Sequence, residues 1–118
     1  MATSKASTAT AAEVYQPNAF DRKLVERALR ERSRYRYVTP AVRIVESGFQ
    51  VESPCCSRRV DADGGVVDIA LLLCRQPGAW GLYRKDHAAA QWLLHGTYAW
   101  LSELLEELKN DPKQIFWQ

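Results

Sequence analysis

One apolar stretch, residues 66–74 (VVDIALLLC), constrains the fold more than any other part of the chain. It is nearly continuous, with Asp68 as its one interruption, and turn-forming residues flank it at positions 61–65 and 76–78. A short aliphatic and β-branched run between two turns is typical of a strand in the middle of a sheet. We therefore expect residues 66–74 to form a central strand that is buried on both faces.

Further strands are predicted by the alternation of apolar and polar residues around this stretch. Phe49 and Val51 alternate with Gln50 and Glu52, the period of a half-buried strand, and Ser47-Gly48 before them is a turn signal that predicts a hairpin. The strands that we expect beside the central one are residues 41–46, 49–53, 79–85 and 91–97.

A helix is predicted on each side of this run of strands. Asn18 is an N-cap candidate, and the first helix is expected to run to about Arg34, with Arg32 projecting toward its apolar side and either fraying or pairing with a carboxylate. The second helix ends before Pro112. Its apolar positions are Trp100, Leu101, Leu104, Leu105 and Leu108.

The predicted fold class is therefore α+β: an N-terminal helix, an antiparallel β-meander of four to five strands and a C-terminal helix. Residues 1–12 are small and polar; residues 1–17 are expected to be a disordered tail, and residues 18–118 a single domain. The apolar residues 115–117 are expected to fold back onto the domain.

Composition indicates the cellular compartment but not the activity of the protein. The chain of 118 residues has three cysteines, two of them adjacent, which is no disulfide framework, and neither a secretory signal nor an apolar run long enough for a bilayer. We expect a cytoplasmic protein with no membrane contact. Residues 1–60 carry a net charge of +5 and residues 61–118 one of −3, which suits either an anion-binding half or two halves that complement each other in a dimer.

One candidate ligand or anion site follows from the meander. Every second connection of a meander lies at the same end of the sheet, so residues 54–65 and 86–90 are expected to be neighbours. Two guanidinium groups there would activate a thiol or bind an anion, and a histidine would act as the base. The structural alternative is that the two cysteines pack in the interior and the arginines form local ion pairs. The residues concerned are Cys56, Arg58, Arg59, Asp86 and His87.

No metal or other cofactor is expected. Cys56, Cys74, His87 and His95 would suit zinc as residue types, but the meander places them in two pairs at opposite ends of the sheet.

A basic stripe on the first helix is the candidate nucleic-acid surface. Cations bind phosphates and interleaved tyrosines stack on bases, although Glu26→Arg30 and Arg27→Glu31 pairs would partly neutralise the stripe. A solvated helix face is the alternative that we favour, because the net charge of the chain is small. The stripe consists of Lys23, Arg27, Arg30, Arg34 and Arg36.

These observations favour a non-enzymatic binding module that self-associates, most simply as a homodimer, or that binds another protein. The contact would come from an exposed sheet edge or from the second half of the chain, which holds all four tryptophans. A nucleic-acid-binding protein is the first alternative, and a ligand or thiol-dependent site at Cys56 and His87 is the second.

Several short segments together resemble a family of small uncharacterised bacterial proteins, a domain of unknown function. The segments are YVTP (37–40), SPCCSR (53–58), DGGVVDIA (63–70) and the ending DP…FW (111–117), together with the strand around Trp80. The likeness covers about residues 20–118. It implies a bacterial, intracellular α+β domain, and it implies no particular activity, cofactor or catalytic residue.

Overall fold

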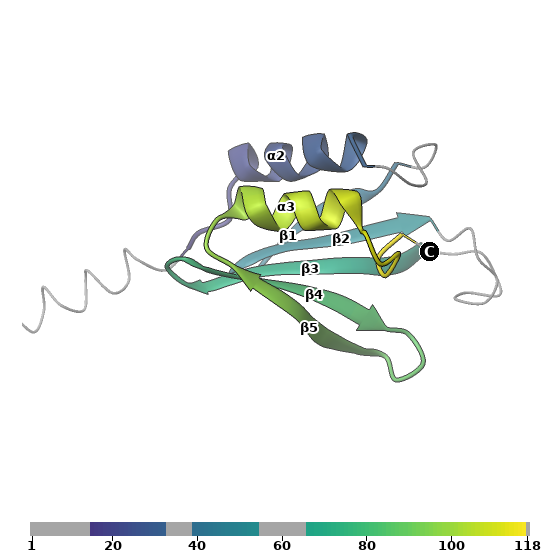
Figure 1. Ribbon diagram of the computed structural model, residues 1–118. Helices are drawn as coiled ribbons and strands as arrows, with labels where there is room; N and C mark the ends of the chain where they lie inside the picture. The colour runs from purple at the N-terminus through teal and green to yellow at the C-terminus, as the bar shows by residue number, and fades with distance from the viewer. Residues whose placement is uncertain (1–14, 33–38, 55–65, 118) are drawn as a thin grey trace, which may run out of the picture.

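The computed structural model describes residues 15–32, 39–54 and 66–117, and it confirms the α+β class. Five antiparallel strands form one sheet in the order β1-β2-β3-β4-β5, and two helices lie side by side over one face of it (Figure 1). In chain order the elements are α2 (Ala19–Arg30), β1 (Ala41–Val45), β2 (Gly48–Pro54), β3 (Val66–Gln76), β4 (Ala79–Asp86), β5 (Gln91–Tyr98) and α3 (Leu101–Asn110).

Strand β3 occupies the middle of the sheet, as the apolar stretch predicts. Ala70, Leu72 and Cys74 are buried beneath the helices, where they pack with Phe49 and other core residues. The expectation that this strand is buried on both faces is confirmed only in part: both helices lie on the same face, yet Leu73, on the opposite face, is only 6% exposed. On the opposite face, which we call the open face, Leu71 is only half-buried.

The β1–β2 hairpin turns at Glu46-Ser47, where Ser47 takes a positive φ of 68°. Gly48 follows it and pairs with Leu73 of β3. A Cβ atom on Gly48 would stand 1.7 Å from the carbonyl oxygen of Leu72, so only glycine lets the two backbones approach this closely.

Helix α2 begins as predicted but ends earlier. The Asn18 side chain accepts a hydrogen bond of 2.8 Å from the backbone N–H of Asp21. The predicted end near Arg34 is wrong: the helix stops at Arg30, and Arg32 is only 2% exposed. Leaving the helix allows its guanidinium to stack on Trp117, 4.6 Å from the ring centre, while it donates a hydrogen bond to the carbonyl of Leu29.

The segment after α3 folds back onto the domain, as its apolar residues predict. Asp111 ends the helix in the left-handed conformation, and its buried carboxylate accepts hydrogen bonds from the backbone N–H groups of Ile115, Phe116 and Trp117 at 2.7–3.1 Å. The Trp117 indole N–H donates to the carbonyl of Leu108 at 3.0 Å. This segment therefore closes one end of the core.

Two aromatic residues differ from their expected positions. Trp100, predicted on the apolar face of the second helix, is 68% exposed because it lies at the N-cap position just before the helix. Tyr15, which precedes the expected domain start, packs edge-on against Trp80 at 4.8 Å and donates a hydrogen bond of 2.6 Å to Asp21. Tyr15 is therefore already in contact with the core. Burial is the main cause that raises the pKa of the Tyr15 hydroxyl, and the neighbouring Asp21 carboxylate raises it further.

Candidate interaction surface

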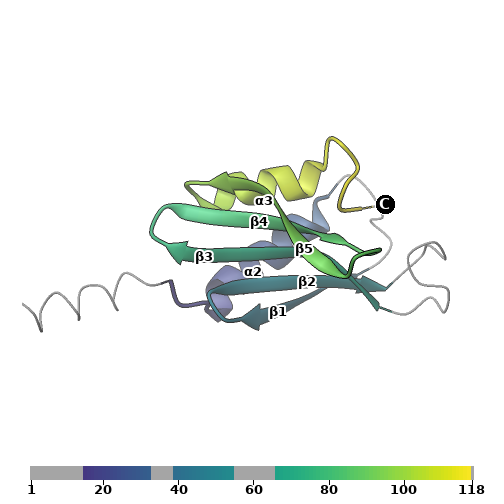
Figure 2. The same ribbon diagram turned by 90° about the horizontal axis from the view of Figure 1, so that it is seen from below.

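The open face carries a strip of apolar and aromatic side chains across three strands. Directly paired residues of antiparallel strands share a face, and the pairs Leu71–Tyr83 and Tyr83–Leu94 form one such row. Figure 2 views the sheet from this side. None of the three residues is buried, and Leu94 is 55% exposed.

Asp68, the charged residue inside the apolar stretch, organises a polar cluster beside this strip. Its carboxylate accepts a hydrogen bond of 2.8 Å from the Gln50 amide and pairs with the Lys85 ammonium at 3.0 Å. The same ammonium lies 4.8 Å from the ring centre of Trp92, a cation–π distance. Because Asp68 and Lys85 neutralise each other, this part of the face is aromatic and uncharged overall, a character that suits a protein partner better than a polyanion.

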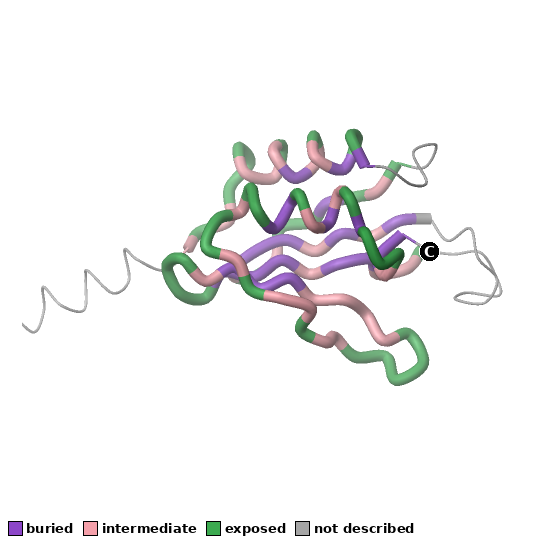
Figure 3. The backbone as a smooth tube through the Cα atoms, viewed as in Figure 1, coloured by how far each residue is buried: buried purple, intermediate pink, exposed green. Residues whose placement is uncertain are grey.

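Residues 83–94, which we call the β4–β5 arm, extend past the region that the helices cover (Figure 3). No residue of the arm is buried, although Trp92, Leu93 and Leu94 follow one another on β5. A register shift sets the arm apart from the rest of the hairpin: Leu82 pairs with Gly96 but Tyr83 with Leu94, which leaves His95 as the extra residue of a bulge. A two-stranded ribbon without a core of its own has little stability in water.

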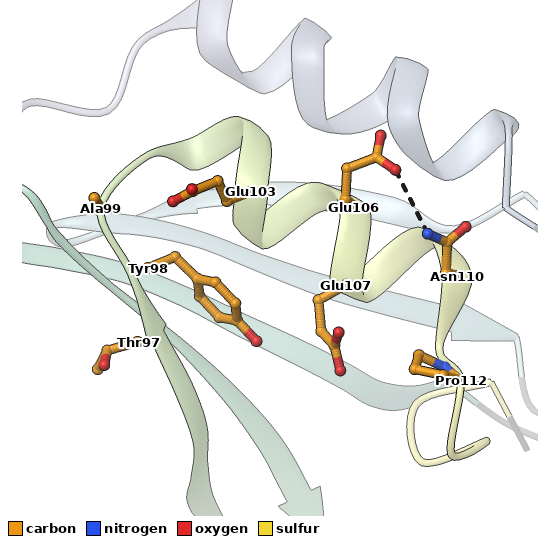
Figure 4. Close-up of a pocket in the computed structure, with 8 residues that line it drawn as sticks. All are labelled: Thr97, Tyr98, Ala99, Glu103, Glu106, Glu107, Asn110 and Pro112. Carbon is orange, nitrogen blue, oxygen red and sulfur yellow. Dashed lines mark hydrogen bonds between the residues drawn. The ribbon is translucent and has the colours of Figure 1, made fainter.

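A groove of about 530 Å³ lies between β5 and α3, and Figure 4 shows its lining. Glu103, Glu106 and Glu107 make it acidic, and Glu107 is held by His95 at 3.0 Å. Burial and the nearby Glu107 raise the pKa of the Tyr98 hydroxyl in the same groove. The three carboxylates are spread along α3, and Glu106 is paired with Lys109 at 2.9 Å, so the groove forms no defined cation site.

The structure places only part of the predicted ligand site. Asp86 ends β4 and His87 is exposed in the turn that follows, where the Asp86 carboxylate accepts a hydrogen bond of 3.2 Å from the Ala89 N–H. The meander puts this turn at the same end of the sheet as the connection from β2 to β3. The other three residues of the predicted site belong to that connection and lie outside the described residues: Cys56, Arg58 and Arg59.

The basic stripe is exposed where it is described. Lys23, Arg27 and Arg30 lie on the outer side of α2, whereas Arg34 and Arg36 are outside the described residues. Glu31, the expected partner of Arg27, instead lies 3.6 Å from Lys109 of α3.

Cys74 and His95, two of the four residues considered as zinc ligands, already have other partners. The Cys74 thiol is buried and lies 3.3 Å from the carbonyl of Gln76, and burial raises its pKa, which makes it a poor metal ligand. His95 lies in the middle of β5 on the helix side, not at the strand end as expected, and contacts Glu107. Across residues 15–32, 39–54 and 66–117, no three His, Cys, Asp or Glu side chains gather as metal ligands.

Neither the polar cluster nor the arm was predicted from the sequence. Asp68 was a signal for the cluster, because a carboxylate inside a buried strand needs partners. Its partners Gln50 and Lys85 lie on different strands and become neighbours only through the register. For the arm, the signal was the run Trp92-Leu93-Leu94 in a strand without charged residues.

Comparison with known proteins gives a family but no activity. The model of DUF3024, a domain of unknown function, matches residues 14–118. The chain belongs to this family. The resemblance noted in the sequence is thereby confirmed at the level of the family. Searches of curated proteins and of solved structures each gave no match. No helix in the described part of this DUF3024 chain has the length and apolar character needed to cross a membrane.

Proposed function

We propose that this DUF3024 domain is a non-enzymatic interaction module that binds protein and self-associates. The observation that carries the proposal is the β4–β5 arm, which presents Trp92, Leu93 and Leu94 with no core beneath them. Trp92 and Leu94 share one face of the arm with Tyr83, and exposed apolar groups gathered in this way mark interaction surfaces, in which tryptophan is enriched.

The chemistry of the described residues supports binding over catalysis. The buried Cys74 thiol, with its raised pKa, is a weak nucleophile, and within the described residues it is not hydrogen-bonded to His95, whose partner is Glu107. A free thiol in the core also suits the reducing bacterial cytoplasm in which we expect the domain to act.

Light scattering after size exclusion tests the proposal. We expect a dimer that persists at high salt, because the arm and the open-face strip are apolar, and that dissociates on dilution. A chain that stays monomeric at every accessible protein concentration would contradict self-association. A pull-down with purified partner candidates would then test the remaining claim of binding to another protein.

Nucleic-acid binding is the second candidate, and one observation favours it. Glu31 pairs with Lys109, so it does not neutralise Arg27 as the i,i+4 spacing predicts. Replacing Lys23, Arg27 and Arg30 together by glutamine should weaken oligonucleotide binding and flatten its salt dependence if the stripe binds phosphates. Binding that is absent at low salt in the unaltered chain would eliminate this candidate.

A further inference from the structure

The two edges of the sheet differ in how well they are protected against pairing. Edge strands expose unpaired backbone groups, and proteins guard them with short length, proline and charge. β1 has only five residues, follows Pro40 and carries Arg43 at its centre. β5 has eight residues, with no proline and no Asp, Glu, Lys or Arg. β5 is therefore the edge open to another strand.

We propose that β5 of one chain pairs antiparallel with β5 of a second copy about a two-fold axis, which joins the two sheets into one. This inference rests on the proposed self-association, names the second copy as the partner and assigns the contact to β5. Such pairing would satisfy the free backbone groups of both edges at once.

The uncharged character of β5 is what selects a second copy as its occupant. Residues near a two-fold axis face their own counterparts, so a charged residue there would meet the same charge. Arg43 would bring this repulsion to the β1 edge, weakened by its ion pair with Glu52 at 3.1 Å. On β5, an axis at Leu93 sets Trp92 of one chain opposite Leu94 of the other, so the contacts across the axis are apolar, and the two Leu94 side chains lie diagonal to each other on the same face.

The shape of the hairpin sets the limits of the pairing. A bulge interrupts an edge, so the bulge at His95 confines regular pairing to residues 91–94. These residues lie in the arm, which projects away from both helices and leaves room for a second sheet (Figures 1 and 3). Pairing there would also cover Leu94, which is more than half exposed in the single chain.

Opposite charges introduced at Leu94 test the proposal directly. We expect Leu94→Lys and Leu94→Asp each to raise the dimer Kd at least about a hundredfold, because each charge is placed against Trp92 of the other chain and lies diagonal to its own copy near the axis. An equimolar mixture of the two variants should recover the dimer as a mixed species. Ile44→Lys is the matched control, since Ile44 is a 46% exposed aliphatic residue on the other edge strand, and it should leave the dimer Kd unchanged.

Each outcome separates this inference from the proposed function. If the unaltered chain dimerises but both Leu94 variants remain dimers, β5 pairing is overturned while self-association stands. If the unaltered chain is monomeric, both are overturned. Circular dichroism of the variants excludes misfolding as the cause of dissociation. Amide hydrogen exchange of the unaltered chain gives a second readout: residues 91–94 should gain protection at dimer-forming concentration, and unchanged exchange there would also overturn the pairing.

Discussion

The segment around Asp111 and the β4–β5 arm use the same residue types in opposite ways. Trp117 is buried with its indole N–H bonded to a carbonyl, whereas Trp92 lies half-exposed under an ammonium group. Asp111 holds three backbone N–H groups inside the fold, whereas Asp86 holds one in an exposed turn. Stability accounts for the residues of the first region. It does not account for the apolar residues of the arm, and this difference is the reason to look for function there.

The largest difference is expected between the two tryptophans. Trp117→Ala should lower the free energy of unfolding by about 3–5 kcal/mol, because it empties a large buried site. Trp92→Ala should cost about 1 kcal/mol, mainly the cation–π contact with Lys85. Urea unfolding at a concentration where the chain is monomeric measures both. Equal losses would show that the arm has a core of its own and would remove the contrast.

The two aspartates should differ next. Asp111→Ala leaves three backbone donors without their acceptor and should cost about 3 kcal/mol, whereas Asp86→Ala should cost about 0.5–1 kcal/mol. Asp111→Asn keeps an acceptor and tolerates the positive φ of 41°, so its loss should lie between these two. Thermal unfolding of the three variants provides the comparison. A loss from Asp86→Ala as large as that from Asp111→Ala would contradict it.

Two glycines sharpen the contrast at the level of the backbone. Gly48→Ala places a Cβ atom against the Leu72 carbonyl and should cost about 1–3 kcal/mol, since backbone must move. Gly96→Ala meets only the outer part of the Tyr98 side chain, with the hydroxyl nearest at 3.0 Å; this side chain can shift, so the substitution should cost less than about 1 kcal/mol. The midpoints of denaturant unfolding rank the two variants. The reverse order would mean that β5 is held more tightly than the centre of the sheet.

The smallest effect is expected from pH. Burial raises the pKa of Cys74 in the folded state, so the thiol keeps its proton there after the unfolded chain has released it. Stability from this group is fully present below its ordinary pKa of about 9.0 and declines as pH rises through the folded value. Cys74→Ala should therefore flatten the alkaline decline in the free energy of unfolding. An unchanged slope in this variant would show that the thiol is not shielded in the fold.

Local patterns predicted most of the fold. The Asn18 cap, the Ser47-Gly48 turn signal and the alternation along residues 49–53 are short-range properties, so the sequence alone reveals them. What failed depends on how elements meet. Residues 66–74 are less buried on the open face because both helices lie on the other face, and the early end of α2 accompanies the stacking of Arg32 on Trp117.

The candidate surface was less predictable for the same reason. Asp68 and Lys85 become partners only in the three-dimensional register, and the solvent exposure of Trp92 depends on which face of the sheet the helices cover. The predicted ligand site and basic stripe were chosen by residue type, and the structure describes only part of each. The anion and thiol chemistry of Cys56, Arg58 and Arg59 therefore stays a prediction.

The contact between Arg32 and Trp117 also bears on the order in which the chain folds. Each strand of the meander pairs with its sequence neighbour, so the hairpins close short loops and can form quickly. The Arg32–Trp117 stack closes a loop that contains the whole sheet. The entropy lost in closing this loop is offset only after the strands are in place. We expect α2 and the segment after α3 to join last, with the sheet as their template, so the lifetime of the folded chain depends on how rarely these two ends separate.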